Sequence, residues 1–171
     1  MESVTELTTT QLSLDDLLSG LRRVVIVVPC SAAKREQDRP AGIYSYPAGE
    51  LYLGQFHTYA RNHAARLGAD VLILSAGSGL LELDQQIAPY DKRITDADSI
   101  AYNAGPRIVA DQVAALDLNN PETIVVSFCP AAYTAELVKA IPTLRTPLAG
   151  SRGIGEQRGR IARLTRDELL G

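Results

Sequence analysis

The sequence predicts an α/β fold, a three-layer sandwich in which a central, mainly parallel sheet is flanked by helices. Three short apolar runs rich in β-branched residues are the first observation, at 22–29, 70–75 and 122–129. Continuous runs of this kind are typical of parallel strands that are buried on both faces. Segments with helical spacing separate the runs, and this alternation favours strands joined by crossover helices.

One domain accounts for the length and composition of the chain. With 171 residues, 46% of them hydrophobic, the chain is long enough for one sizeable core and short for two. Residues 1–22 are expected to form a polar tail and a short amphipathic helix, which Ser13 caps and which ends near Gly20. The single α/β domain is expected to span 23–171.

The elements are expected in alternating order along the chain. After the first strand, the segment 35–49 is charged and contains proline and glycine, which predicts a mobile surface loop. Apolar residues at helical spacing predict a helix within 51–68, with Gly68 as its stop. The later helices are expected at 105–116, 130–141 and 155–170, on either side of the strand at 122–129.

Composition excludes several classes of function. The net charge of −3 argues against a broad surface that coats nucleic acid, although a local basic patch remains compatible with it. Cys30, Cys129, His57 and His63 are the only cysteines and histidines, and their spacing matches no zinc site or redox pair. We therefore expect buried free thiols in a reducing cytoplasm and no metal. The N-terminus lacks the pattern of a signal peptide, so the expected location is cytoplasmic.

Loops after the predicted strands contain the candidate binding residues, because ligands of open parallel sheets bind at the carboxyl ends of the strands. The first strand leads into "CSAAK", where Lys34 offers a positive charge for phosphate or carboxylate. The second leads into "SAGSGLL", where glycines let the backbone approach a ligand. Neither stretch has the spacing of a Walker loop or a dinucleotide fingerprint.

Two carboxylates lie just beyond the second of these strands. Asp84 and Asp91 are separated by a short segment that contains Tyr90, and either carboxylate is suited to act as a general base or to stabilise a cationic transition state. The alternative is structural: Asp84 caps a turn, and Asp91 pairs on the surface with Lys92 or Arg93.

Arginine is concentrated near the C-terminus. The glycine-rich stretch 149–160 precedes the last expected helix and is either an anion-binding nest or a plain loop. The arginines around it form either the solvated face of an amphipathic helix or a contact surface for phosphate. They are Arg145, Arg152, Arg158, Arg160, Arg163 and Arg166.

Four stretches, in order, resemble one superfamily. "CSAAK", "ELYLGQFHTYA", "LILSAGSGLLELDQQIAPYD" and "TPLAGSRGIGEQ" resemble small bacterial and phage proteins of unknown function that share a Cys-x-x-x-Lys loop and the motifs "LSAxxGLL", "IxPYD" and "GIGxQ". The central stretch is also similar to the YaaA peroxide-stress proteins. The resemblance implies a compact α/β domain related to the YaaA-like and uracil-DNA-glycosylase-like folds. Its associations are 7-deazapurine modification, N-glycosidic cleavage, and DNA binding or protection from damage.

This resemblance implies a hydrolase that cleaves the N-glycosidic bond of a nucleoside, a nucleotide or a modified base in nucleic acid, with no cofactor. Asp91 is the first candidate for the catalytic carboxylate and Asp84 the second. Tyr52 or Tyr90 is expected to stack on the base. The residues expected to contact the substrate are Cys30, Ser31, Lys34, Tyr52, Ser75, Gly77, Ser78, Gly79, Tyr90, Arg152 and Gln157.

The sequence departs from the superfamily pattern at Gly77 and Ser78, where relatives often have Lys-His or Leu-Tyr. A role that these residues have elsewhere is therefore not transferred to this chain. The alternative function is a non-catalytic protein of the YaaA type that binds or protects DNA through the C-terminal arginines. A small-nucleotide sensor, or a subunit whose partner supplies the chemistry, is the third hypothesis.

Overall fold

The three β-branched runs form the parallel core of one sheet in the computed structural model, which describes residues 22–102 and 105–171. Strand β1 (Arg23–Pro29) lies in the centre, between β3 (Asp70–Ser75) and β6 (Thr123–Ser127), and pairs with both in parallel. A fourth strand, β4 (Gly79–Glu82), runs antiparallel on the outer side of β3, so the order is β4-β3-β1-β6. The predicted α/β sandwich with a mainly parallel sheet is confirmed.

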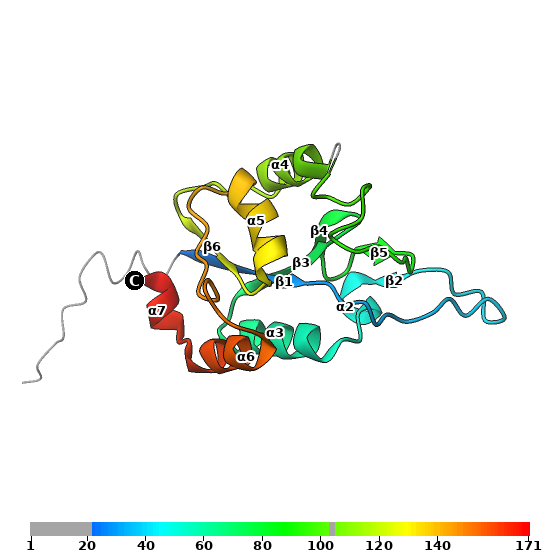
Figure 1. The fold of residues 1–171 in the computed structure, drawn as a ribbon, viewed down its shortest axis with the longest axis horizontal. Coiled ribbons are helices and arrows are strands. Elements are labelled where there is room, and N and C mark those ends of the chain that lie inside the picture. The colour runs from blue at the N-terminus through cyan, green and yellow to red at the C-terminus, as the bar shows by residue number, and fades with distance from the viewer. Residues whose placement is uncertain (1–21, 103–104) are drawn as a thin grey trace, which may run out of the picture.

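Helices cover both faces of this sheet (Figure 1). Helices α3 (Gln55–Arg66) and α6 (Ile154–Arg163) pack on one face, and α4 (Gly105–Ala115) and α5 (Ala131–Ala140) pack on the other. Along β1 the side chains alternate between the two faces, yet all of them from Val24 to Val28 are buried. Burial on both sides is the physical reason that the strand is continuously apolar.

Three short elements were not predicted from the sequence. Helix α2 (Ala48–Leu51) follows β2 (Tyr46–Pro47), and β2 pairs antiparallel with β5 (Gln86–Ile87) to form a second, two-stranded sheet. The segment 35–49 was expected to be a loop throughout. Most of it is exposed loop, but its C-terminal end forms β2 and the start of α2.

Two helices replace the single helix that was expected over 155–170. Helix α6 ends at Arg163, and α7 (Arg166–Leu170) begins after Thr165, which has the extended conformation of a helix N-cap. The Thr165 side chain accepts a hydrogen bond from the Glu168 amide, and the Glu168 side chain accepts one from the Thr165 amide. This reciprocal capping box starts a new helix, so the prediction of one continuous helix is wrong.

A segment after α5 lies beside the outer edge of β6. Arg145 forms a parallel bridge with Val126, and its amide donates to the Val125 carbonyl oxygen at 2.9 Å.

The predicted N-terminal tail and the helix capped by Ser13 lie outside the described residues. None of the described helices is long and apolar enough to cross a membrane.

Close packing at the start of α3 gives the first testable prediction. A β-carbon at Gly54 would overlap the β-carbon of Ser31. Gly54→Ala is therefore expected to lower the free energy of unfolding by about 1–3 kcal/mol, as overpacking usually does. The matched control is Gly155→Ala in α6, where an added β-carbon meets no atom within 4 Å. Denaturant unfolding measures both, and equal stability of the two variants would contradict the packing described.

Candidate functional site

The carboxyl ends of the three parallel strands lie at one edge of the sheet (Figure 1). From β1 the chain crosses to β3 on one side, and it later returns to β6 on the other side. The strand order therefore reverses at β1, and ligands of open α/β sheets bind at such a reversal point. Cys30, Ser75 and Cys129 lie at this edge, directly at or after the ends of the strands.

Three hydroxyl groups form a chain of hydrogen bonds at this edge. The Tyr90 hydroxyl lies 2.8 Å from the Tyr52 hydroxyl and 2.7 Å from the Ser75 hydroxyl. Burial raises the pKa of Tyr52 to about 12, and burial together with the nearby Cys30 raises the pKa of Tyr90 as well. Both phenols are therefore neutral near pH 7. We refer to Tyr52, Tyr90 and Ser75 as the hydroxyl chain.

The glycine turn after β3 is folded around the last member of this chain. The amides of Gly77 and Ser78 donate to Ser75 Oγ at 3.2 and 3.0 Å. These amides already have a partner inside the protein, so in this arrangement they are not available to hold an anion. The turn instead fixes Ser75 Oγ against the Tyr90 hydroxyl.

A side chain from α4 completes the turn. Gln112 Oε1 accepts a hydrogen bond from the Leu80 amide at 2.7 Å, and its Nε2 donates to the Ser78 carbonyl oxygen at 2.9 Å. Gly79 has a φ of 72°, and a β-carbon there would collide with Gln112 Oε1. The absence of a β-carbon at Gly79 therefore leaves room for the Gln112 side chain. The role of Gln112 was not predicted from the sequence.

Lys34 lies on the aromatic members of the hydroxyl chain. Its Nζ is 4.4 Å from the centroid of the Tyr90 ring and 5.8 Å from that of Tyr52. An ammonium group at this distance is attracted by the ring electrons. In the part of the chain that the structure describes, no carboxylate forms an ion pair with Lys34. Its charge remains available to a ligand.

An open groove of about 480 Å³ lies beside this lysine. The loop after β1 lines one side of the groove, and the segment after β5 lines the other. We call it the Lys34–Asp91 groove, and its lining residues are Ala32, Lys34, Arg35, Glu36, Pro89, Tyr90 and Asp91. The first choice of carboxylate and the predicted lysine, 57 positions apart in the sequence, thus line the same groove.

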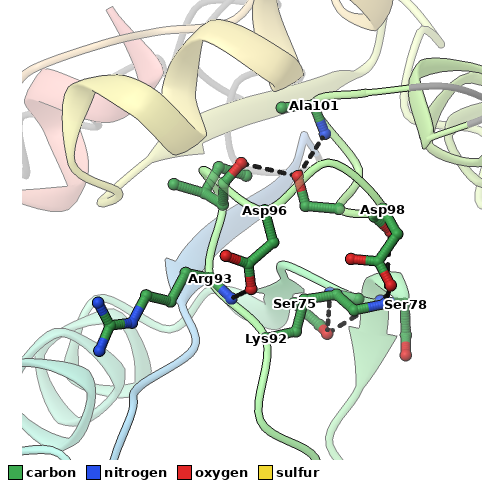
Figure 2. Close-up of polar contacts among 10 residues, drawn as sticks. Ser75, Ser78, Lys92, Arg93, Asp96, Asp98 and Ala101 are labelled. Atoms are coloured by element: carbon green, nitrogen blue, oxygen red, sulfur yellow. Dashed lines mark hydrogen bonds and ion pairs between the residues drawn. The ribbon is translucent and has the colours of Figure 1, made fainter.

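Asp91 is exposed, and among the described residues it has neither an ion pair nor a hydrogen bond from its side chain. Lys92 forms an ion pair with Asp98 at 2.8 Å. Arg93 donates to Asp96 at 2.7 Å through its backbone amide, and no carboxylate of the described residues forms an ion pair with its guanidinium. Figure 2 shows the Arg93 side chain pointing away from these residues. Surface pairing of Asp91 with Lys92 or Arg93, which the sequence left open, is not present in this structure.

Comparison with known proteins places this site within a family. The model of a family of unknown function, DUF6884, matches residues 25–163. The chain belongs to the DUF6884 family. No curated protein gives a significant match. The matched region contains most of β1, the Lys34–Asp91 groove and the late glycine-rich stretch, so the groove lies within the DUF6884 region of the chain.

Ser31 and Cys30, from the first loop of the DUF6884 region, contact other parts of the protein. Ser31 Oγ donates to the Ala33 carbonyl oxygen at 2.7 Å and accepts from the Gly54 amide at 3.0 Å. Cys30 Sγ lies 3.3 Å from the Tyr133 hydroxyl. Both cysteines are free, as predicted, but only Cys129 is buried, since Cys30 is partly exposed at the end of β1. Burial raises the pKa of the Cys129 thiol, which keeps it protonated.

His57 is a positioning residue that the sequence did not single out. It is buried, and its Nδ1 donates to the carbonyl oxygen of Pro29, the last residue of β1, at 2.7 Å. The imidazole centroid lies 5.4 Å from that of the Tyr52 ring. Burial lowers the pKa of His57, so the ring is neutral near pH 7. The side chain holds the end of β1 where the Cys30 loop begins.

Most of the C-terminal arginines bind inside the protein. Arg145, Arg160 and Arg166 donate to the backbone carbonyl oxygens of Leu169, Ala149 and Leu67, at 2.7, 2.6 and 2.7 Å. The Arg158 guanidinium lies over the Tyr59 ring, 5.0 Å from its centroid. Arg152 and Arg163 are the exposed members of the set. The expected phosphate-binding surface is therefore reduced largely to these two side chains.

Three other predicted residues lie outside the groove. Asp84 is exposed in the turn after β4, a strand that runs back along β3 and away from the carboxyl edge. Arg152 is exposed and its amide donates to Glu156 at 2.9 Å. Gln157 is buried and lines a second cavity. Among the residues that the structure describes, no group of three or more His, Cys, Asp or Glu side chains is placed to hold a metal ion.

The hydroxyl chain gives a prediction about stability. Tyr90→Phe removes the hydroxyl that joins Tyr52 to Ser75 and leaves both without that partner. We expect the free energy of unfolding to fall by about 1–3 kcal/mol. Tyr44→Phe is the control, because Tyr44 is 56% exposed and should change stability by less than about 0.5 kcal/mol. Denaturant unfolding tests this, and a Tyr90→Phe variant as stable as the control would contradict it.

His57 gives a prediction about pH. Because the pKa of His57 is lower in the folded protein than in the unfolded chain, the unfolded chain takes up the proton first on acidification. Stability is therefore retained above about pH 6.5 and falls as the pH decreases below it, by up to about 1.4 kcal/mol per pH unit. His57→Gln should show a shallower decline between about pH 7 and 5, measured by denaturant unfolding. Identical pH dependence of the free energy of unfolding in the wild type and in His57→Gln would exclude a contribution from His57.

Proposed function

We propose that the protein hydrolyses the N-glycosidic bond of a nucleobase-containing substrate, with Asp91 as the catalytic carboxylate. One observation carries the proposal: Asp91, without an ion pair among the described residues, lines the same groove as Lys34, whose ammonium group has no carboxylate partner there. The sequence resemblance of the central "IAPYD" stretch, which ends at Asp91, supports it. The substrate class is a nucleoside, a nucleotide or a modified base in nucleic acid.

The chemistry needs a carboxylate that a substrate can reach. When the base departs with the bonding electrons, the sugar becomes an oxocarbenium-like cation, which an adjacent carboxylate stabilises. Water then attacks the anomeric carbon and passes a proton to Asp91, while the leaving base takes up a proton from solvent. Asp91 is exposed at the wall of the groove, which leaves room for both water and sugar.

Lys34 is suited to hold an anionic group of the substrate. Its ammonium group lies over the Tyr90 ring, and within the described part of the chain it donates a single, long hydrogen bond, 3.4 Å, to the Ala32 carbonyl oxygen. A phosphate or a sugar oxygen in the groove would gain a stronger, charge-assisted bond. This favours nucleotides over nucleosides as substrates.

Base stacking on Tyr52 forms no part of the proposal. Tyr52 is 3% exposed, and its hydroxyl is bonded to Tyr90. The Tyr90 ring, which was also expected to stack, carries Lys34 over one face, and a β-carbon added at Gly77 would come within van der Waals contact of it. Its role in the proposal is to position Lys34 and Asp91 at the groove.

The DNA-binding alternative of the YaaA type has less support. Three of its six arginines donate to backbone carbonyl oxygens and a fourth lies on a tyrosine ring. A sensor that binds a nucleotide without cleaving it uses the same groove. Turnover, rather than binding, therefore separates these hypotheses.

Release of free base is the deciding measurement. Purified protein is incubated with a panel of nucleosides, nucleotides and DNA with modified bases, and the products are separated by chromatography. Asp91→Asn should lower kcat at least about 100-fold, because general acid–base groups contribute about 10²–10⁴-fold. Lys34→Met should mainly raise KM for nucleotides. Asp111→Asn, which removes an exposed carboxylate on α4, should have no effect on either constant.

Two results would overturn the proposal. One is the absence of base release from every substrate in the panel, and the other is full activity of Asp91→Asn. If the first occurs, DNA binding is measured as a function of salt. Affinity that falls steeply with salt and is lost when Arg152 and Arg163 are changed to Gln would support the DNA-binding alternative.

A further inference from the structure

A second cavity, separate from the Lys34–Asp91 groove in its lining, lies beside the carboxyl end of β6. Its volume is about 470 Å³, within the range of small-ligand sites. Helix α5, the segment 146–151 and the first turns of α6 surround it. The lining residues are Ser127, Cys129, Ala131, Thr134, Ala135, Val138, Thr146, Leu148, Ala149, Gly150, Ser151 and Gln157.

The cavity forms where two neighbouring segments diverge. Ser127 is the last residue of β6, and its amide donates to the Arg145 carbonyl oxygen at 2.9 Å. Beyond this bond, one segment turns into α5 and the other into the turn that begins at Thr146. The space between these two segments is the cavity.

Helix α6 holds the outer wall of the cavity in place. Arg160 donates to the carbonyl oxygens of Pro147 and Ala149 at 3.3 and 2.6 Å, and its guanidinium pairs with Glu156 at 2.6 Å. Glu156 also accepts a hydrogen bond from the Arg152 amide at 2.9 Å. The wall is thus fixed by contacts within the protein, so a ligand would enter a largely preformed site.

Two hydroxyl groups of the lining, those of Ser127 and Thr134, can act toward a ligand only as acceptors. Thr134 Oγ1 donates to the Cys129 carbonyl oxygen at 3.0 Å, and Ser127 Oγ lies 2.7 Å from Thr134 Oγ1. Because the Thr134 proton is already used, Ser127 is the donor between the two hydroxyls. Both protons are therefore spent inside the protein. Ser127 Oγ also accepts a hydrogen bond from the Cys129 amide at 3.2 Å, so one lone pair remains on each of the two oxygens to accept from a ligand.

Gln157 is the unsatisfied acceptor of the site. The residue is 8% exposed and lines the cavity, and none of the described residues donates to its Oε1. A buried acceptor without a donor is unfavourable, and a ligand that supplies the donor removes that penalty. The terminal torsion of a glutamine is soft, so the amide can turn toward a bound group.

The rest of the lining excludes charged ligands. It contains no Lys, Arg, His, Asp or Glu, and the side chains of Ala131, Ala135, Val138 and Leu148 supply an apolar wall. An ionised phosphate or carboxylate would lose its hydration there without gaining a cation. The lining instead suits a neutral ligand with a flat apolar face and an edge of N–H donors.

We propose that this cavity binds a neutral nitrogen heterocycle that donates an N–H hydrogen bond to Gln157 Oε1. The chemistry is that of a nucleobase, either free or as the base of a nucleoside. The inference does not rest on the proposed hydrolase activity, because none of the cavity residues lines the Lys34–Asp91 groove.

Binding of simple probes tests the inference. Adenine, cytosine, uracil and their nucleosides are titrated into the full-length protein and followed by calorimetry and ligand-observed NMR. Nucleoside monophosphates are the charged counterparts. At least one neutral probe should bind saturably with a 1:1 stoichiometry. Comparison of each base with its nucleoside shows which of the two the cavity accepts, and the monophosphates should bind here at least 10-fold more weakly.

Variants assign the binding to the cavity. Gln157→Leu should weaken binding at least 10-fold without lowering the melting temperature, because it removes an acceptor that has no donor among the described residues. Ala135→Leu fills the cavity from an exposed position on α5 and should have the same effect on binding. Gln55→Leu, an exposed change on α3, is the matched control and should bind as the wild type does.

The outcomes separate this inference from the hydrolase proposal. Neutral probes that bind to wild type but not to Gln157→Leu or Ala135→Leu support the cavity, whether or not base is released. No saturable binding of any neutral probe would overturn the inference, and so would binding that both variants retain. A loss of melting temperature in Gln157→Leu, with binding unchanged, would assign Gln157 a structural role and would also overturn it.

Discussion

The Tyr90 hydroxyl is the contact on which the architecture of the groove depends. It joins the segment after β5 to the end of β3 through Ser75, and to the loop region before α3 through Tyr52. Lys34 rests on the ring of the same tyrosine, and Asp91 is the next residue in the chain. Burial keeps both phenols protonated, so the chain of hydrogen bonds persists over the whole physiological pH range. One side chain thus sets the relative positions of the two charged candidates.

The parts of the fold that the sequence predicts are those with a local signal. The runs that became β1, β3 and β6 are continuously apolar because helices cover both faces of the sheet, and their bounds were close to those observed. Strand β4 was not predicted from the sequence. It has only four residues, and it pairs antiparallel with β3 after a short turn. The two-residue strands β2 and β5 depend on a partner about 40 positions away, which no local pattern reveals. The break between α6 and α7 is encoded by Thr165 and Glu168, a capping signal within an otherwise continuous amphipathic pattern.

The residues of the candidate site likewise include some that the sequence could predict and others that it could not. Lys34 follows β1 directly, so its place at the carboxyl edge was open to inference from topology. Asp91 comes after β4 and β5, so its place beside Lys34 depends on strand pairings that no local pattern reveals. The functions of Gln112, His57 and Tyr133 were not open to inference either, since each acts through a backbone or side-chain group on a distant segment. The arginines show the opposite problem: their number suggested a phosphate surface, but a count of charges does not reveal that carbonyl oxygens of neighbouring turns are their partners. Charge composition is therefore a weak guide to a surface when cations can complete hydrogen bonding at the ends of helices and turns.

The Gln112 side chain has a further consequence for the sheet. Its side-chain Oε1 accepts a hydrogen bond from the backbone amide of Leu80 in β4, and its Nε2 donates to the carbonyl oxygen of Ser78, just before that strand. A peptide group of a neighbouring strand would make the same pair of bonds. The Gln112 side chain of α4 thus occupies hydrogen-bonding groups at the outer edge of β4 as a neighbouring strand would. An edge strand whose backbone groups are unpaired is a template on which a strand of another molecule can add. The contact that shapes the glycine turn therefore also protects the sheet against self-association through this edge.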